Sequence, residues 1–491
     1  MELPTIDLAI LVGYLLGMVA FGVWIGRRQQ DVADYMVGGR NLPWWLVLFS
    51  IVATETSTVT FLSIPGYGWS QDLTWLQLPM GFLLGRLLVV ILLLPGYFRG
   101  QIFTAYQILH DRFGGSTERV ASLLFIATRT VADGLRLYLS AIALQKITGI
   151  DMEWAVAAMG GATVIYTFVG GMRAVVWTDF IQFVIYLAGA ILAFALLLDG
   201  IDGGFAGLVE RAGQAGKLRV FDSGFDLARP HQLLAGLIGG AILTLATHGV
   251  DQLMVQRYLC AKSRSEASVA LATSGLVVVL QFALFLLIGV ALWAWYGQHH
   301  PRQGFEKGDE VFATFIVAEL PAGARGIVLG AVFAAAMSTL SSSLNSSATA
   351  LHTNFWAPLF RPGAADREQL WTVRLFTVGF GALQVAVGIG GQNLEDSVVN
   401  AVLAIASFTT GIILGVFLLG IGAARVGQLA ALIGLCAGAA TVSTLHFAPL
   451  DRWFDAWPGV AWPWFALIGS GTTFVVGYLA SFVFPRHRVT A

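Results

Sequence analysis

Residues 333–349 read FAAAMSTLSSSLNSSAT, a run of hydroxyl-bearing and small side chains inside an apolar segment long enough to cross a bilayer. Its polar side chains recur at i, i+3, i+4 and i+7 and would share one helical face: Ser338, Ser341, Ser342 and Asn345. The small side chains of Ala334–Ala336 would let a neighbouring helix approach closely. The pattern favours a dry, oxygen-lined groove suited to a desolvated alkali cation. It is equally typical of ordinary helix packing in lipid, so both interpretations stay open.

The whole chain has the composition of an all-α polytopic membrane protein. Of its 491 residues, 57% are hydrophobic and only 12% charged, with a mean hydropathy of +0.75. Such values exclude an ordinary soluble domain. Apolar runs predict about 13 transmembrane helices, near residues 6–26, 43–65, 72–98, 117–148, 151–170, 172–200, 232–259, 265–297, 325–357, 369–390, 395–421, 426–446 and 461–484. The first run lacks a basic leader and a cleavage site, so we expect a retained helix rather than a signal peptide.

The distribution of basic residues predicts how the chain sits in a plasma membrane, and the short loops suggest a bacterial inner membrane. With the N-terminus outside, the cytoplasmic loops carry about twice as many Lys and Arg residues as the outer loops. We therefore expect an outer N-terminus and a cytoplasmic C-terminus. The longest polar stretches, residues 201–231 and 298–324, then lie outside, and residues 306–320 could form a short amphipathic helix there. Cys260 and Cys436 suggest neither a disulfide nor a metal site, and we expect no cofactor.

Two of the predicted spans have polar centres that would interrupt a helix. One contains Thr54–Ser57 and ends at Pro65; the other contains Thr247, His248 and Gly249. Unwound backbone is tolerated in a membrane where it lines a cavity or is buried in protein. Inverted-repeat transporters place such broken helices at equivalent positions of two halves, and these two spans are five helices apart. The spacing predicts two inverted five-helix repeats within a single transmembrane domain.

Several ionisable residues fall inside predicted spans, where each needs a partner or a wet cavity. Arg129, Asp133 and Arg136 have the spacing of a structural ion pair. Asp179 has no basic residue one helical turn away and is a candidate sodium ligand, because hard cations take oxygen ligands. Alternatively, its carboxylate caps a helix or accepts hydrogen bonds from nearby indoles and hydroxyls. Glu55 could face a solute, bind a proton, or lie protonated in a polar network.

Six segments together resemble the sodium/solute symporter family, which includes sodium/glucose, sodium/proline and sodium/sialic acid cotransporters. They are DYMVGGRNLP at 34–43, SIVATETSTVTFLSIPG at 50–66, YFRGQIFTAYQILHDRFG at 97–114, GGMRAVVWTDFIQ at 170–182, DQLMVQRYLCAKS at 251–263 and the serine-rich stretch at 333–349. The resemblance implies a LeuT-type core of ten helices at 43–421, preceded by one extra helix at 6–26 and followed by two at 426–484.

The resemblance also implies two sodium sites. The general site of the family falls on backbone and hydroxyl oxygens of Ala53, Thr56, Ala335, Ser338 and Thr339. A second site, present in some members, falls on Asp179, Ser338, Ser341 and Ser342. Sodium would then be the coupling ion, with one or two ions per solute.

The solute site implied by the resemblance departs from that of the sugar carriers. Their Asn, Gln or His, Lys, Gln and Tyr correspond here to Glu55, Thr60, Gln281, Leu403 and Thr247. A hexose is therefore not expected. An ionised Glu55 would disfavour a carboxylate solute, whereas a protonated one would not. The cavity candidates are mixed and polar, which suits a small hydrophilic solute: Glu55, Thr60, Gln77, Thr247, His248 and Gln281.

These observations predict a sodium-coupled symporter that imports a small polar organic solute by alternating access. We expect no nucleic acid and no required protein partner. The alternatives are a proton-coupled carrier in which Glu55 or Asp179 titrates, a transporter-like sensor, and an intramembrane hydrolase. No signalling domain follows the last predicted span, which disfavours the sensor. A hydrolase would use a serine among 341–343 with His352 as its base, but no nucleophile motif is present.

Overall fold

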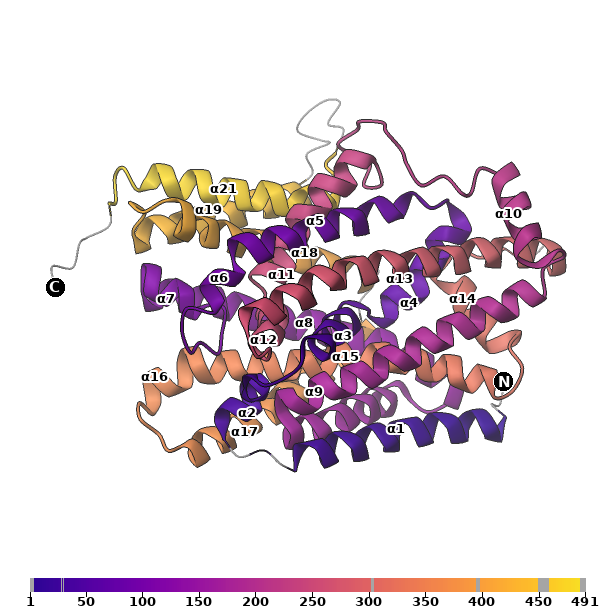
Figure 1. The fold of residues 1–491 in the computed structure, drawn as a ribbon, viewed down its shortest axis with the longest axis horizontal. Helices are drawn as coiled ribbons and strands as arrows, with labels where there is room; N and C mark the ends of the chain where they lie inside the picture. The colour runs from indigo at the N-terminus through magenta and orange to yellow at the C-terminus, as the bar shows by residue number, and fades with distance from the viewer. Residues whose placement is uncertain are drawn as a thin grey trace.

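The structure is a computed structural model that describes residues 4–27, 29, 31–301, 304–393, 398–448 and 459–485. In these ranges the regular elements are helices, most of which run along one common direction (Figure 1). The side chain of Leu403 and the first residues of the predicted span 395–421 lie outside the described residues. The all-α polytopic fold expected from the sequence is thus observed.

Each predicted span coincides with helix. The long elements are α1 (Thr5–Gly26), α5 (Gln77–Leu92), α8 (Gly115–Thr148), α9 (Met152–Asp199), α13 (Arg264–His299), α15 (Ala324–Leu351), α17 (Asp366–Gly390), α18 (Val398–Gly422), α19 (Gln428–Phe447) and α21 (Phe465–Ala480). Among the described residues, eight helices are individually long and apolar enough to cross a membrane, and nine if one bent pair is counted. Of the other predicted spans, 151–170 and 172–200 share α9, and 117–148 carries several charged residues. Within the described residues, the apolar helical parts of 232–259 and 395–421 are shorter, Ala235–Gly249 and Thr409–Gly422.

Gly171 marks the boundary between the two predicted spans 151–170 and 172–200, which together make up the 48-residue element α9. Its φ of 49° and ψ of −154° are non-helical and kink the element at this point. A Cβ atom there would lie 2.6 Å from Gln29 Nε2 and 2.7 Å from Tyr35 Cδ2. Only glycine adopts this backbone and leaves this space without strain.

Both expected helix breaks are present. The first separates α3 (Trp44–Glu55) from α4 (Thr58–Ser70), and the two halves are bent by 63°. The second separates α11 (Gly240–Gly249) from α12 (Gln252–Leu259). Here Asp251 caps α12, because its carboxylate accepts the amide of Leu253 at 2.9 Å. Such caps satisfy backbone donors that an interrupted helix leaves free.

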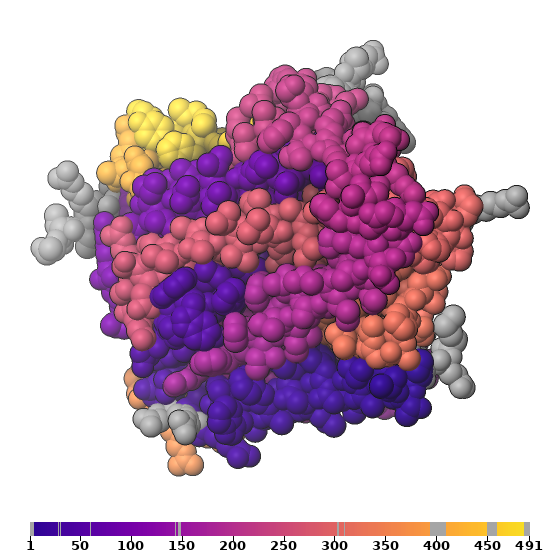
Figure 2. Space-filling view, turned by 45° about the vertical axis from the view of Figure 1, so that its right-hand side comes forward, coloured from indigo at the N-terminus to yellow at the C-terminus, as the bar shows by residue number. Residues whose placement is uncertain are grey.

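The serine-rich helix α15 forms the centre of the bundle. Its most apolar window is 89% buried, against 17% for α1. Helix α1 lies along one edge beside α9, as the indigo band of Figure 2 shows. The central position of α15 places its hydroxyl face in contact with α9, α8 and the first broken helix.

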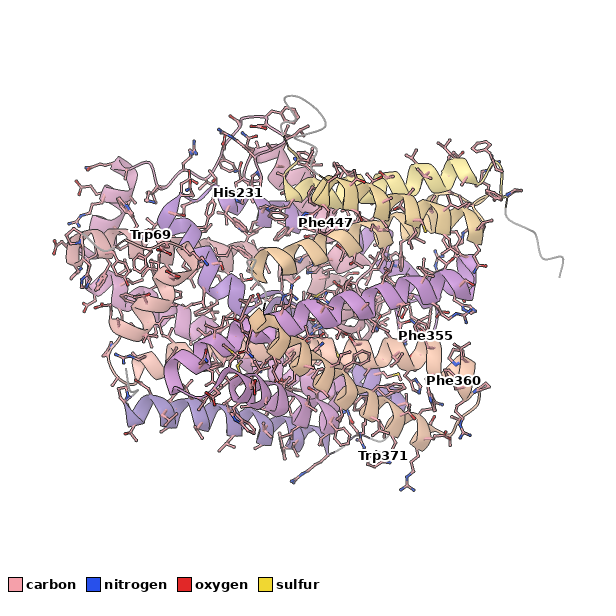
Figure 3. All side chains as sticks on the ribbon, turned by 180° about the vertical axis from the view of Figure 1, so that it is seen from behind. Trp69, His231, Phe355, Phe360, Trp371 and Phe447 are labelled. Carbon is pink, nitrogen blue, oxygen red and sulfur yellow. The ribbon has the colours of Figure 1, made fainter. Side chains whose placement is uncertain are left out.

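The polar connections gather at the two ends of the bundle. Helices α10 (Gly204–Gln214) and α14 (Gly308–Ala318) lie at the end where α1 begins, and α14 confirms the short helix expected in residues 306–320 (Figure 1). Trp69 and His231 lie toward this end, whereas Phe355 and Phe360 lie toward the other (Figure 3). Helix α21 ends at that opposite end.

Candidate ion and solute sites

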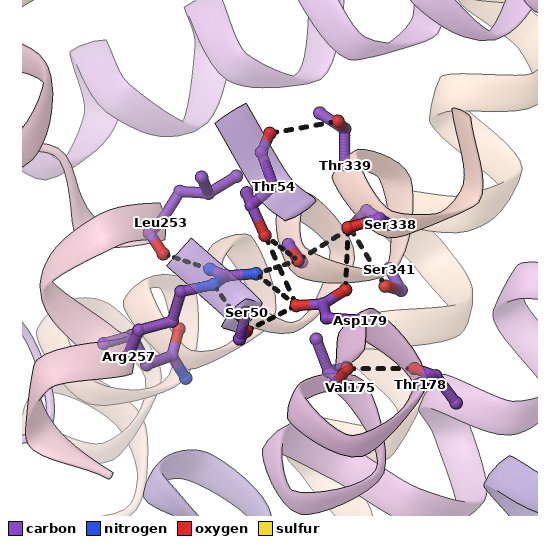
Figure 4. A network of polar contacts seen from close by, with 12 residues as sticks. Ser50, Thr54, Val175, Thr178, Asp179, Leu253, Arg257, Ser338, Thr339 and Ser341 are labelled. Carbon is purple, nitrogen blue, oxygen red and sulfur yellow. Dashed lines mark hydrogen bonds and ion pairs between the residues drawn. The ribbon is translucent and has the colours of Figure 1, made fainter. Parts of the chain in front are cut away.

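Asp179 lies at the centre of a fully buried polar network between α9, α3 and α15 (Figure 4). The hydroxyl of Ser338 donates to its Oδ1 at 2.8 Å. The hydroxyls of Ser50 and Thr54 donate to Oδ2, the latter at 3.3 Å. The network brings Asp179 and Ser338 together, as expected for a shared second sodium site, and adds two hydroxyls from the first broken helix.

Asp179 has a basic partner, although no basic residue lies one helical turn away in its own helix. Arg257, on α12, places Nη2 at 3.0 Å from Asp179 Oδ2, and both side chains are buried. The same Nη2 contacts the hydroxyl of Ser342, while Nε donates to Ser50 at 3.0 Å. The sequence within one helical turn of Asp179 could not reveal this ion pair, because the partner is 78 residues away.

The residues expected at the general sodium site meet where α15 passes the first helix break. Thr339 donates its hydroxyl to the backbone carbonyl of Thr54 at 3.1 Å. Thr56 follows α3 with a φ of −87° and a ψ of 103°, which ends the helical hydrogen bonding there. The residues expected to contribute backbone or hydroxyl oxygens are all buried: Ala53, Thr56, Ala335, Ser338 and Thr339. Neutral oxygens in this arrangement are the donor set that a hard cation prefers.

A cavity of about 290 Å³ lies between the two helix breaks. This volume is at the lower end of the roughly 300–1,000 Å³ of small-molecule pockets. Its walls come from both broken helices, from α8 and from α18. Four of the six expected solute residues line it, namely Glu55, Thr60, Thr247 and His248. Further hydroxyls come from Thr128, Thr244, Thr409 and Thr410.

Glu55 is charge-paired rather than free. Its carboxylate contacts Arg86 of α5, and the Nε2 atom of His248 lies 3.6 Å from Oε2. Arg86 is fully buried, and the side chain of Glu55 is 15% exposed. A buried charge is stable when such a partner offsets its desolvation. Glu55 therefore joins the end of α3 to α11 across the cavity without a net negative charge.

The charged residues of α8 also face the cavity. The expected ion pair is confirmed: Arg129 lies 3.7 Å from Asp133, and Arg136 also contacts that carboxylate. Arg129 contacts Asp251 at the second helix break as well. The guanidinium side chains retain some exposure, 16% for Arg129 and 21% for Arg136, and both line the cavity. The sequence indicated only their structural role.

Gln77 and Gln281 are used elsewhere and do not line this cavity. Gln77 donates to the carbonyls of Thr74 and His231, each at 3.0 Å, and so ties the loop that carries His231 to α5. Burial lowers the pKa of His231 to about 4.

Gln281 donates to the hydroxyl of Thr56 at 2.6 Å and therefore supports the first helix break.

Sequence reasoning missed the role of Arg257. Arg86 and Asp251 are among the ionisable residues inside predicted spans that were expected to face a partner or a wet cavity, but the sequence did not identify their partners. Asp251 and Arg257 lie six residues apart in the segment 251–263, which carries the family resemblance. Their place in that segment indicates a role in the transporter core. The residues considered for a hydrolase are not assembled. Ser343 instead accepts a hydrogen bond from Gln384 at 2.9 Å, and His352 stacks on Trp356.

Two broken helices around a cavity whose largely apolar wall carries a few hydroxyl and charged groups, beside a hydroxyl-lined central helix, define a secondary transporter of the LeuT type. The model of the "Sodium:solute symporter family" matches residues 35–438. The chain therefore belongs to the sodium:solute symporter family. It is a multi-pass membrane transporter and not an enzyme, and sodium is the coupling ion of its family.

Individual relatives agree with this family. The chain is 27% identical to the sodium/sialic acid symporter SiaT of Proteus mirabilis, over 98% of this chain and 96% of that one. It is 29% identical to the human sodium-coupled monocarboxylate transporter 2, over 84% of this chain and 67% of the other. The solved structure of a substrate-bound, outward-open Na⁺-coupled sialic acid symporter superimposes with a TM-score of 0.87 at 26% identity, covering 98% of both chains. The fold alone is shared with MHP1, a nucleobase-cation-symport-1 transporter, at a TM-score of 0.61 and 14% identity.

Proposed function

We propose that this protein imports a small polar organic solute that carries a carboxylate, together with sodium, by alternating access. The supporting observation is the cavity between the two helix breaks, with Arg129 and Arg136 in its wall. One of those breaks meets α15 through the Thr339–Thr54 hydrogen bond, at the general sodium site. Ion and solute would thus bind to two faces of the same interrupted helix.

A carboxylate solute fits the charges of the cavity. Glu55 would repel an anion if it were unpaired, but Arg86 offsets its charge. Arg129 and Arg136 share Asp133 and keep some exposure, and a guanidinium recognises a carboxylate through paired N–H donors. Relatives named for sialic acid and monocarboxylate transport support the same class of solute. Threonine hydroxyls in the wall suit the polar remainder of such a solute.

The mechanism follows from what each group binds. Sodium at the general site would hold α15 to the first break, which organises the cavity for the solute. Solute binding then favours closure, and the two ligands raise each other's affinity reciprocally. With the N-terminus outside, a membrane potential that is negative inside adds about 2.3 kcal/mol per charge per 100 mV to uptake.

Sodium coupling can be tested first on the purified protein. We expect the melting temperature to rise saturably when sodium replaces potassium at constant ionic strength, because a ligand of the folded state stabilises it. In proteoliposomes, an inward sodium gradient should drive uptake of solutes found in this screen. Uptake that follows pH and ignores sodium would refute the proposal and favour proton coupling. That alternative requires Glu55 or Asp179 to leave its guanidinium partner.

The solute class is tested with matched ligands. For a carboxylate that stabilises the protein in sodium, the corresponding amide should bind at least about tenfold more weakly, since it loses a charge-assisted pairing worth roughly 1.5–3 kcal/mol. Equal binding of acid and amide would contradict the carboxylate while leaving sodium coupling intact.

A further inference from the structure

Helix α12 joins the ion site to the solute cavity. It is the eight-residue second half of the second broken helix. Asp251 precedes its first residue and Arg257 lies six residues further on, about 9 Å along the helix. The two side chains carry opposite charges and contact different partners. One end of α12 therefore contacts the buried Asp179 network, and the other contacts the cavity.

At the ion site, Arg257 takes up the oxygens that a second sodium ion would need. Its Nη2 lies 3.0 Å from Asp179 Oδ2 and also contacts the hydroxyl of Ser342 (Figure 4). A guanidinium and a sodium ion carry like charges, so they repel each other when they share one carboxylate in a buried site. Asp179 is fully buried, so no water screens that repulsion.

At the cavity, Asp251 holds Arg129. This contact is the link between α12 and α8, since Arg129 belongs to α8 and lines the cavity. Asp251 also caps α12 through the amide of Leu253. A shift of α12 would therefore change how firmly Asp251 holds the guanidinium that faces the solute.

We propose that Arg257 is a tethered competitor of sodium at Asp179 and that α12 transmits this competition to the cavity. Sodium entering the second site displaces the guanidinium from Asp179 and Ser342. The loss of this contact loosens α12, which weakens the hold of Asp251 on Arg129 and leaves Arg129 available to a solute carboxylate. Arg257 is thus a positioning residue that couples the second ion to solute affinity. This inference rests on the proposed function.

The test uses the full chain with Arg257→Gln. Without the competing cation, Asp179 should bind sodium more tightly, and the half-saturating sodium concentration in the thermal assay should fall on the order of tenfold. The ratio of solute affinities at saturating and low sodium should shrink at least about fivefold, because Arg129 is then released without the second ion. Adding Asp179→Asn to the variant should abolish the gain in sodium affinity.

Gln256→Met is the matched control on the same helix. Gln256 is buried and donates to Asn345 at 2.8 Å and Thr349 at 3.0 Å, but it does not contact Asp179. Its loss should lower stability. It should leave unchanged both the half-saturating sodium concentration and the ratio of solute affinities at saturating and low sodium.

The outcomes separate this inference from the proposed function. A wild-type protein without a sodium-specific response refutes the proposed function itself. A wild-type response that Arg257→Gln does not alter overturns only the role of Arg257. Should Arg257→Gln fail to fold, Arg257→Lys replaces it: the shorter ammonium reaches fewer of the same oxygens, so a smaller fall in half-saturating sodium is expected. A folded lysine variant with wild-type sodium dependence would also overturn the proposal.

Discussion

The two helix breaks differ in the chemistry of the helix that faces them. At the first, Thr339 of α15 donates a neutral hydroxyl to a backbone carbonyl. At the second, Asp251 contacts Arg129 of α8, so the polar groups there are charged and paired. An interrupted helix exposes similar backbone groups in both places. The comparison teaches that the neighbouring helix decides whether a break suits a bare cation or a charged solute.

The largest effect should come from removing an oxygen at the ion side. Ser338→Ala deletes the hydroxyl shared by both expected sodium sites, which donates to Asp179. Its oxygen would face the sodium ion at both sites, and a neutral oxygen facing a cation is worth about as much as a hydrogen bond to a charged group, roughly 1.5–3 kcal/mol. The half-saturating sodium concentration should therefore rise roughly 10- to 100-fold in the thermal assay. Ser346→Ala is the control, because that hydroxyl, also buried on α15, donates only to the carbonyl of Ser343. If Ser338→Ala and Ser346→Ala changed the half-saturating sodium concentration equally, the first helix break would not be the ion side.

A smaller effect is expected on the solute side. Arg86→Gln leaves the carboxylate of Glu55 beside the cavity without its guanidinium partner, with His248 still near it. Its repulsion should weaken binding of a carboxylate solute about tenfold, the range of one close charge interaction at a partly shielded site. Solute-induced stabilisation in saturating sodium measures this change. The half-saturating sodium concentration should stay within about twofold of the wild-type value.

A second substitution should show whether Arg86 acts through its charge or through packing. Glu55→Gln combined with Arg86→Gln removes both charges and should restore most of the solute affinity. A double variant as weak as Arg86→Gln alone would show that Arg86 acts through packing rather than through charge.

The smallest expected effect is a pH dependence of stability from His231, which lies at neither helix break. His231 contacts the rings of Tyr67 and Trp75, lies near Asp72, and its pKa is lowered by burial to about 4. Its unfolded pKa is about 6.5. The unfolded chain therefore binds more protons between these values, and stability is lost as pH falls from 6.5 toward 4. The loss at pH 5 is at most about 2 kcal/mol.

This pH effect is measured as the difference in melting temperature between pH 7.5 and pH 5. His231→Phe should reduce the difference, and half-saturating sodium at pH 7.5 should not change. A variant that shifts the sodium response would mean that the loop carrying His231, tied to α5 through Gln77, takes part in ion binding.

Much of the fold could be predicted because its signals are local. Apolar runs located the helices, and polar interruptions located both breaks. The spacing placed Ser338 on a hydroxyl face, and the family resemblance implied that Ser338 and Thr339 meet the first break. The predicted boundary between residues 151–170 and 172–200 falls at Gly171, where α9 is kinked. The sequence did not show that Gln77 and Gln281 bond away from the cavity, because either amide could have faced a solute on the basis of its position alone.

The sequence by itself determined which helices form, where two of them break, and which face of α15 carries oxygen atoms. Those properties depend on hydropathy and on spacings of a few residues, which the chain specifies wherever it folds. Only the tertiary structure decided the charge partners: Asp179 meets Arg257 across 78 residues, and Glu55 meets Arg86 across 31. In a buried, poorly screened interior, such partners determine whether a carboxylate is free to bind a cation, and helix packing alone selects them.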